Sequence, residues 1–353
     1  MGTEPLPAAA YRAADFDYEL PTDLIAQAPL AERSASRLLV VRRSVSGQGA
    51  REDRWFSQLP ELIPPGDLLV LNTTRVRHAR LRGTRSSGAA AEILLIHPAT
   101  GDQWVAIGQP GSALRPGKRI GLGEGISVET VAILDGGERL VRFIGATAEE
   151  AIRRWGTLPL PPYIAREATT EDDIRYQTVY AEREGSVAAP TAGLHFTPAL
   201  LDDLAARGVS LTRLDLEVGP GTFRPIESED LSAHRMHPER FTIPAEAADS
   251  MARTRAAGGR VWAVGTTVVR ALESAARDGG LVHAGQGETR LMITPGFRFR
   301  VVDHLITNFH LPRSTLLCLV CAFGGYETMM AAYRHAVGHR YRFYSYGDAM
   351  VVV

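Results

Sequence analysis

The 353-residue chain has very little cysteine and no long apolar run. Its two cysteines, Cys318 and Cys321, are too few for a disulfide framework, so the composition fits a reducing compartment. They lie three residues apart in an apolar segment, where we expect them to pack in a helix core. No apolar stretch approaches the roughly 20 residues that span a bilayer, and the first residues lack a signal-peptide pattern. We therefore expect a cytoplasmic protein without a membrane anchor.

An excess of charge of either sign is also missing. The formal net charge is −1, which offers no overall attraction to polyanions, so any nucleic-acid surface must be local. Lys118 is the only lysine, and arginine supplies nearly all the positive charge. Arginine suits bidentate phosphate contacts, but a codon-biased genome also explains the use of arginine in place of lysine. We favour the second explanation.

The chain divides into regions of different pattern. Residues 1–10 are small and proline-rich and are expected to form a disordered tail. From residue 76 to about residue 145, short apolar stretches alternate with turn clusters, which predicts a small all-β, barrel-like region. Much of the remainder alternates strands with helices, which favours an α/β core. The β region is therefore interpreted as an insertion in an α/β domain.

At three places in the expected α/β core, the sequence predicts that a helix begins. Thr197 precedes a proline and a run with leucines on one face, as at the N-terminus of a helix. The apolar segment Val261–Val264 leads through Gly265 into a helical pattern, and His304–Asn308 precedes a helix capped by Ser314. In open α/β sheets, ligands bind at such strand ends, where helix N-termini offer free N–H groups.

Two histidines in these loops are candidates for acid or base chemistry. His195 and His310 each lie just ahead of a predicted helix, and an imidazole titrates near neutral pH. A histidine that only stabilises its loop through hydrogen bonds is the simpler interpretation of each, and both interpretations stay open. His234 and His237 have a spacing that metals use, but no third ligand cluster accompanies them, so no metal is predicted.

Glycines and arginines mark two further candidate sites. Gly219 and Gly221 resemble the start of a dinucleotide fingerprint, but the third glycine is missing; a tight turn is favoured, and it could still present N–H groups to a ligand. A dense basic stretch lies where the chain enters the β region and could either hold RNA phosphates or form a solvated strand face. It contains Arg75, Arg77, His78, Arg80, Arg82 and Arg85. Residues 333–344 interleave cations with aromatic rings, for which a packed terminal element is the simpler explanation.

These loops resemble the signatures of the S-adenosylmethionine:tRNA ribosyltransferase-isomerase family, which acts in queuosine biosynthesis. The similar segments follow one another in a single order along almost the whole chain. They are residues 16–40, 67–81, 158–164, 176–181, 187–197, 218–225, 236–239, 264–274, 307–316 and 341–350. Pattern and resemblance together predict a discontinuous α/β domain of residues 11–75 and 155–353, with a small all-β barrel of residues 76–154 inserted in it.

The resemblance implies an enzyme that transfers and isomerises the ribosyl part of S-adenosylmethionine. The acceptor would be 7-aminomethyl-7-deazaguanine at the wobble position of a tRNA, and the products epoxyqueuosine-tRNA, adenine and methionine. Such a reaction removes a proton beside the sulfonium and needs an acid or a stabilised anion for departing adenine. The donor is a co-substrate, and neither a metal nor a protein partner is implied. We expect a monomer by default.

The resemblance also suggests roles for the loop residues. His195 or His310 would remove the proton, while Asn308 and Thr191 would orient the ribose. Backbone N–H groups of either the Gly219 loop or the Gly265 loop would hold the methionine carboxylate. The full expected donor site is Thr191, Gly193, Gly219, Gly221, Thr222, Gly265, Thr266 and Thr267, and the expected tRNA contacts are Arg75, Arg77 and Arg80.

This chain departs from the family pattern in two places. Gln109, Ser112 and Ala113 follow the strand of Trp104 in a zone where family members commonly carry basic residues, and Ala233 stands where an acid often precedes His234. Two other functions were weighed. A methyltransferase would need a glycine-rich loop that opens a helix, which the Gly219 segment does not provide. A noncatalytic RNA-binding protein would explain the arginines but not the polar loops.

Overall fold

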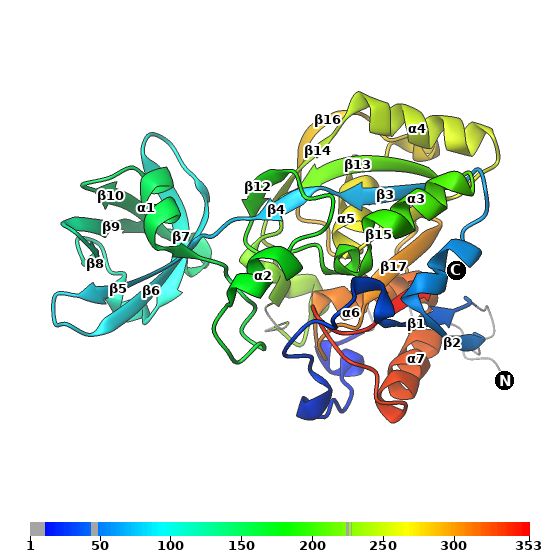
Figure 1. Ribbon diagram of the computed structural model, residues 1–353, viewed down its shortest axis with the longest axis horizontal. Helices are drawn as coiled ribbons and strands as arrows, with labels where there is room; N and C mark the ends of the chain where they lie inside the picture. Colours follow the sequence, from blue (N-terminus) through cyan, green and yellow to red (C-terminus); the bar gives the residue numbers. More distant parts are fainter. Residues whose placement is uncertain (1–10, 44–48, 224–225, 227) are drawn as a thin grey trace.

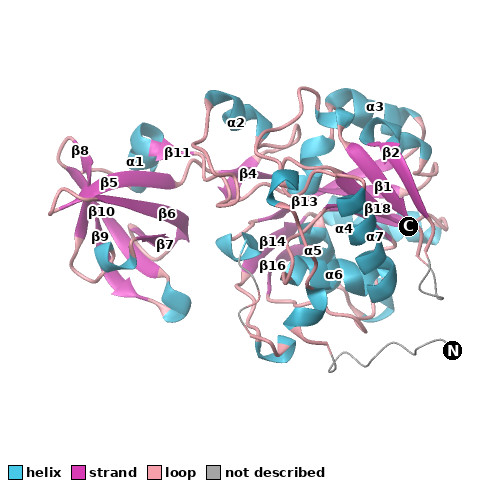
Figure 2. Ribbon diagram, turned by 90° about the horizontal axis from the view of Figure 1, so that it is seen from below, coloured by secondary structure: helices cyan, strands magenta, loops and turns pink. Residues whose placement is uncertain are grey.

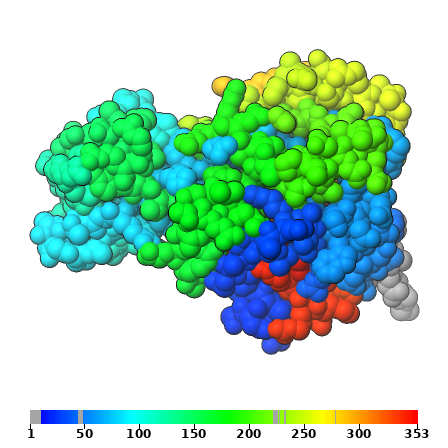
Figure 3. Space-filling view, in the orientation of Figure 1, coloured from blue at the N-terminus to red at the C-terminus, as the bar shows by residue number. Residues whose placement is uncertain are grey.

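The computed structural model describes residues 11–43, 49–223, 226 and 228–353 (Figure 1). The expected tail of residues 1–10 lies outside the described residues. The fold combines a large α/β body with a smaller β-barrel at one end, seen side by side in the space-filling view (Figure 3). The predicted fold class is therefore confirmed.

A nine-stranded mixed sheet forms the body. In spatial order its strands are β16 (Gly285–Thr289), β14 (Glu239–Ile243), β13 (Ser210–Leu216), β3 (Leu68–Asn72), β15 (Val261–Val264), β17 (His304–Asn308), β18 (Ala349–Val352), β1 (Arg37–Val41) and β2 (Arg51–Trp55). The four strands β13, β3, β15 and β17 run parallel to one another. β3 and β15 are buried along their whole length, which is why residues 68–71 and 261–264 are unbroken apolar runs.

Helices cover both faces of this sheet (Figures 1 and 2). Alternate residues of β3 point to opposite faces: Leu68 and Val70 join one core cluster, Leu69 and Leu71 the other. The first cluster includes residues of α4 (Ala245–Ala256), α5 (Thr266–Ala275), α6 (Thr315–Gly324) and α7 (Tyr326–Gly338). The second includes residues of α3 (Pro198–Ala206) and the 3-10 helix η5 (Phe56–Glu61). The result is a three-layer body.

The predicted strand-to-helix junctions are present. The Thr197 hydroxyl accepts a hydrogen bond from Leu200 N at 3.1 Å and caps α3, and Ser314 caps α6 in the same way. Cys318 and Cys321 are fully buried in α6, and burial raises the pKa of both thiols. In the part of the chain that is described, no single helix is long and apolar enough to cross a membrane; α6 and α7 meet that test only jointly, with a bend of 116° between them.

The inserted region is a closed antiparallel barrel. Its strands are β5 (Arg80–Arg85), β6 (Ala90–Pro98), β7 (Gln103–Gln109), β8 (Arg119–Gly123), β9 (Ile126–Ile133) and β10 (Arg139–Ile144), and β5 pairs with β8 to close it. A Cβ at Gly83 would lie 2.4 Å from the Gly121 carbonyl oxygen, so this closure requires glycine. The helix α1 (Ala148–Trp155) packs into the barrel core, and the short strand β11 (Gly156–Thr157) pairs with β5.

Two short strands, β4 (Thr74–Val76) and β12 (Arg183–Ser186), pair with each other near the connection to the body, and α2 (Thr170–Arg175) lies nearby (Figure 1).

Candidate active site at the ends of the central strands

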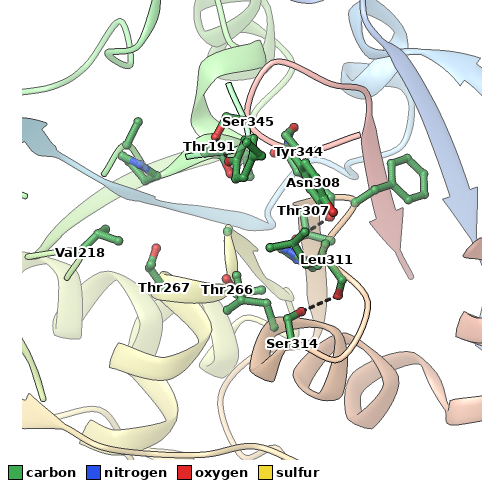
Figure 4. A pocket seen from close by; sticks show the side chains of 18 residues that line it. Thr191, Val218, Thr266, Thr267, Thr307, Asn308, Leu311, Ser314, Tyr344 and Ser345 are labelled. Atoms are coloured by element: carbon green, nitrogen blue, oxygen red, sulfur yellow. Dashed lines mark hydrogen bonds between the residues drawn. The ribbon is translucent and has the colours of Figure 1, made fainter. Parts of the chain in front are cut away.

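A cleft lies where β15 and β17 end, in the region that the strand order predicts for ligand binding. It encloses about 630 Å³ of space, part of it open to solvent. Four segments distant in sequence form its walls (Figure 4). They are residues 189–192, residues 265–267, residues 307–311 with Ser314 and Leu316, and residues 344–345, joined by Tyr163 and Val218.

One wall is the N-terminus of α5. Gly265, at a φ of 93°, turns the chain from β15 into the helix and supplies no side chain to cap it. The first N–H groups of the helix therefore have no intrahelical acceptor and carry the positive end of the helix dipole. The Thr267 hydroxyl is buried and has no hydrogen-bond partner among the described residues. Together these donors suit a carboxylate or another anionic group.

The opposite wall is the end of β17. The Asn308 side chain is 2% exposed, and its Nδ2 donates to the Tyr344 carbonyl at 2.8 Å. The His310 ring lines the cleft, and its Nε2 lies 2.8 Å from the Thr307 hydroxyl. Burial lowers the pKa of His310 to about 3, so the ring is neutral near pH 7.

His195 lies behind this wall rather than on it. It ends the 3-10 helix η8 (Thr191–His195), whose Thr191 does line the cleft. The His195 ring stacks on Phe56 with centroids 4.9 Å apart, and its Nδ1 lies 2.7 Å from the Ser36 hydroxyl. Burial lowers the pKa of His195 to about 4. Of the two candidate histidines, only His310 therefore faces the cleft.

Only some of the other residues expected to bind the ribosyl donor line the cleft. Thr191, Gly265, Thr266 and Thr267 line the cleft, whereas Gly193, Gly219 and Gly221 do not. Gly193 packs so closely against Tyr180 that a Cβ would lie 2.2 Å from the phenol oxygen. Gly219 and Gly221 belong to the turn that contains the 3-10 helix η9 (Pro220–Phe223), the backbone of which includes Thr222. The side chain of Thr222 lies outside the described set.

A buried ion pair between Glu239 and Arg270 contacts that turn. Gly219 N donates to Glu239 Oε1 at 3.4 Å, and the other oxygen of Glu239 accepts from Arg270 Nη1. Arg270 belongs to α5, and the side chains of both partners are at most 5% exposed. The pair thus ties the Gly219 turn to the helix whose N-terminus faces the cleft.

The three expected tRNA contacts lie at the junction of body and barrel. The Arg75 guanidinium donates to the Ala181 carbonyl at 2.7 Å, and that of Arg80 to the Leu160 carbonyl at 3.0 Å. Arg77 lies over the Trp104 ring, 4.9 Å from its centroid, and lines a second hollow of about 1,130 Å³ between barrel and body. Arg77 is therefore the one of the three that lines this hollow.

Comparisons with known proteins agree with the resemblance seen in the sequence. The family model described as "Queuosine biosynthesis protein" matches residues 13–352. The S-adenosylmethionine:tRNA ribosyltransferase-isomerase of Azoarcus sp. (strain BH72) is 54% identical over 339 residues, 96% of each chain. The enzyme of the same name from Anaeromyxobacter sp. (strain Fw109-5) is 53% identical and covers 97% of this chain and 99% of its own. The chain belongs to the S-adenosylmethionine:tRNA ribosyltransferase-isomerase family.

A solved structure supports this membership. The crystal structure of the S-adenosylmethionine tRNA ribosyltransferase from Thermotoga maritima is 36% identical and covers 96% of this chain and all of its own, with a TM-score of 0.55. The family and the enzyme class predicted from the sequence are thereby confirmed.

Sequence reasoning missed part of the cleft wall in this family member. The rings of Tyr163 and Tyr344 are in contact, tilted by 41° with centroids 4.5 Å apart, and the Tyr163 hydroxyl lies 2.6 Å from the Ser345 hydroxyl. All three line the cleft. They come from two segments already matched to the family, 158–164 and 341–350, but nothing in either segment indicates that the two meet.

His234 and His237 do not form part of a metal cluster. Over the described ranges, no group of three or more histidine, cysteine, aspartate or glutamate side chains is arranged to hold a metal ion. His237 instead lies 3.6 Å from Glu138 on the β9–β10 turn of the barrel.

Proposed function

We propose that this chain transfers and isomerises the ribosyl moiety of S-adenosylmethionine onto 7-aminomethyl-7-deazaguanine at the wobble position of a tRNA. The products are epoxyqueuosine-tRNA, adenine and methionine. The observation that carries this proposal is the near-complete match to the family, at 54% identity over 339 residues. The cleft at the ends of β15 and β17 is the candidate donor site.

The residues of the cleft fit the donor. The methionine carboxylate binds the free N–H groups of Thr266 and Thr267 at the start of α5, since these line the cleft and the Gly219 turn does not. The unpartnered Thr267 hydroxyl adds a further donor. Asn308 and Thr191 lie on other walls and orient the ribose. The Gly219, Gly221 and Thr222 turn, with Gly193, then acts through packing rather than direct contact.

His310 is the base of this proposal. Its neutral ring lines the cleft and accepts the proton beside the sulfonium, which leaves an imidazolium. The same proton is then available for adenine as the bond between adenine and the ribosyl carbon breaks. The acceptor amine forms its new bond to the ribosyl group and loses a proton to solvent. Methionine leaves as the bond between the sulfonium sulfur and the ribosyl carbon breaks and its electron pair passes to sulfur. The low exposure of the surrounding wall limits access of water to these steps.

The tRNA is proposed to approach along the junction of barrel and body. Arg77 is the leading candidate for a phosphate contact, because its stack on Trp104 holds the guanidinium at the hollow. All three arginines donate to a backbone carbonyl oxygen, Arg77 to that of Glu184 at 3.2 Å. Arg75 and Arg80 do not line the hollow and would contribute mainly by shaping the same region. A cytoplasmic monomer that uses no metal remains our proposal for the working form.

The test is an assay of products. Purified protein is incubated with S-adenosylmethionine and an anticodon stem-loop that carries the aminomethyl-deazaguanine. Adenine and methionine release, with a ribosyl-derived mass gain on the RNA, is expected. Formation of S-adenosylhomocysteine with a methyl-sized gain would make the protein a methyltransferase and overturn the proposal.

A further inference from the structure

A second pocket, which we call the junction pocket, adjoins the cleft at Val218. Val218 lines both of them, and Figure 4 shows it at one end of the labelled side chains of the cleft. The junction pocket encloses about 400 Å³ of space, part of it open to solvent. The barrel and the body both contribute to its walls, which include Ile96, His97, Gly185, Glu217, Gly219 and Arg240. A substrate that reacts in the cleft can therefore also reach this pocket.

Glu217 gives the junction pocket a carboxylate without a partner. Its side chain is partly buried and makes no hydrogen bond or ion pair with another described residue. A Cβ at Gly185 would lie 2.8 Å from Glu217 Cγ and 3.2 Å from its Oε1, so the Glu217 side chain lies across the backbone of β12. A carboxylate that is partly withdrawn from water gains from a hydrogen-bond donor. A ligand that carries an N–H group would supply that donor.

The other polar side chains of the pocket complete a mixed set of donors and acceptors. The guanidinium of the exposed Arg240 also makes no hydrogen bond or ion pair with a described residue, and it can only donate. His97 Nδ1 donates to the Pro98 carbonyl at 2.9 Å, which leaves Nε2 of the neutral ring as an acceptor. Ile96 and Val218 add apolar surface. Such a set fits a nucleobase, which has an apolar face and an edge of donors and acceptors.

An unpaired base of the RNA is the occupant that the charges and the position favour. A phosphate is disfavoured, because the carboxylates of Glu217 and Glu288 both line the pocket and repel it. The adenine of the ribosyl donor is less suited, because one wall of the pocket belongs to the barrel, along which the tRNA is proposed to approach. Proteins recognise single-stranded RNA through hydrogen bonds to the edges of unpaired bases.

We propose that the junction pocket holds a nucleobase next to the modified one in the anticodon loop, and that Glu217 accepts a hydrogen bond from an N–H group on its edge. The proposal rests on the proposed function, because the modified base must lie in the cleft for its neighbour to reach the pocket. Gly219 then belongs to the RNA site, although it does not line the cleft. The barrel forms one side of that site.

The test uses three anticodon stem-loops that carry the modified base. One is intact, and in the other two an abasic nucleotide replaces the base on one side or the other of the modified base. With wild type, one of the two abasic RNAs is expected to lower kcat/KM for the RNA about tenfold or more, which corresponds to a lost hydrogen bond to a charged group. Glu217→Ala is expected to lower kcat/KM about tenfold with the intact RNA. The same abasic RNA should cost this variant much less than it costs wild type, because both changes remove one contact.

Two controls accompany this comparison. Glu182→Ala removes an exposed carboxylate that pairs with Arg213 at 2.6 Å and does not line the pocket, and it should leave the ratios among the three RNAs as in wild type. The KM of Glu217→Ala for S-adenosylmethionine should stay near the wild-type value. Its Tm should do the same, because the Glu217 side chain makes no hydrogen bond or ion pair within the described chain.

Three results would overturn the proposal. Equal proportional losses from Glu217→Ala with all three RNAs would show that Glu217 contacts neither flanking base. Tighter binding of all three RNAs by this variant would show that the carboxylate only repels phosphate. A raised KM for S-adenosylmethionine with unchanged RNA dependence would assign the pocket to the adenine of the donor. Wild-type protein that yields no ribosylated RNA would instead reject the proposed function, and equilibrium binding of the same RNAs to wild type and Glu217→Ala would then decide the role of the pocket.

Discussion

Two neutral, buried histidines, His195 and His310, predict that this protein loses stability on mild acidification. Burial lowers the pKa of His195 to about 4 and that of His310 to about 3, from an ordinary value of 6.5. Between about pH 4 and 6.5 the unfolded chain therefore binds protons that the folded chain does not, so stability falls as pH falls through this window. Burial lowers the pKa of His304 as well, which acts in the same direction.

The size of the effect follows from the linkage relation. One pKa unit is worth about 1.4 kcal/mol, so integration of the linkage relation makes each of the two histidines cost about 2 kcal/mol of unfolding free energy between pH 7 and pH 5. Together they remove roughly 4 kcal/mol, a large part of the 5–15 kcal/mol typical of native proteins. Urea unfolding at pH 7, 6 and 5 measures this loss directly.

Variants identify the groups responsible for the loss. His195→Gln and His310→Gln should each reduce the pH dependence by about half of the combined effect, whatever they do to stability at pH 7. The exposed His283, changed to Gln, is the matched control for a histidine outside this region. A free energy of unfolding that is equal at pH 7 and pH 5, or a slope unchanged in both variants, would refute the reasoning.

Three further predictions concern single contacts. Thr267→Val should raise KM for S-adenosylmethionine about tenfold, because it removes a buried donor from the carboxylate site; donor-dependence assays measure it. Arg270→Met should lower the free energy of unfolding by roughly 3–5 kcal/mol, because Glu239 is left as a buried charge without its partner. The double variant with Glu239→Leu should lose less of that free energy. Urea unfolding measures the stability of both variants. Arg77→Ala should weaken tRNA binding and reduce its log–log salt slope by about one, as loss of one phosphate contact does, which a salt titration of affinity tests.

Conservative variants provide the controls for these predictions. Thr267→Ser keeps the hydroxyl and should leave KM near the wild-type value; equal KM values for Thr267→Val and wild type would remove this residue from the donor site. A double variant less stable than Arg270→Met would contradict the ion-pair argument. An Arg77→Ala protein with unchanged affinity and salt slope would remove Arg77 as a tRNA contact.

Local patterns predicted the elements that position the site. The apolar run Val261–Val264 followed by Gly265 could be interpreted as strand, turn and helix start, because each step depends on neighbouring residues only. Thr197 and Ser314 were recognisable as helix caps for the same reason. The barrel followed from the spacing of turns, although its closure pairs strands that are distant in sequence. Thr84 of β5 pairs with Gly121 of β8, so the paired residues are 121 − 84 = 37 positions apart.

The direction in which a side chain points, and the contacts between segments distant in sequence, could not be predicted in this way. The sequence places His195 and His310 in similar loops, yet only His310 faces the cleft, because the His195 ring is held between Ser36 and Phe56 from the other side of the sheet. The Gly219 segment resembled a ligand loop, but Gly219 and Gly221 do not line the cleft, and Gly219 N instead donates to Glu239 of β14. The contact between the rings of Tyr163 and Tyr344 depends on segments that meet only in the folded chain.

The central claim is that the cleft between α5 and the end of β17 holds the ribosyl donor. Its most direct test is a crystal structure of the protein with S-adenosylmethionine bound. The account predicts the methionine carboxylate within hydrogen-bonding distance of the Thr266 and Thr267 N–H groups, with the ribose beside Asn308 and His310. A donor bound instead at the Gly219 turn, or in the hollow between barrel and body, would contradict the account.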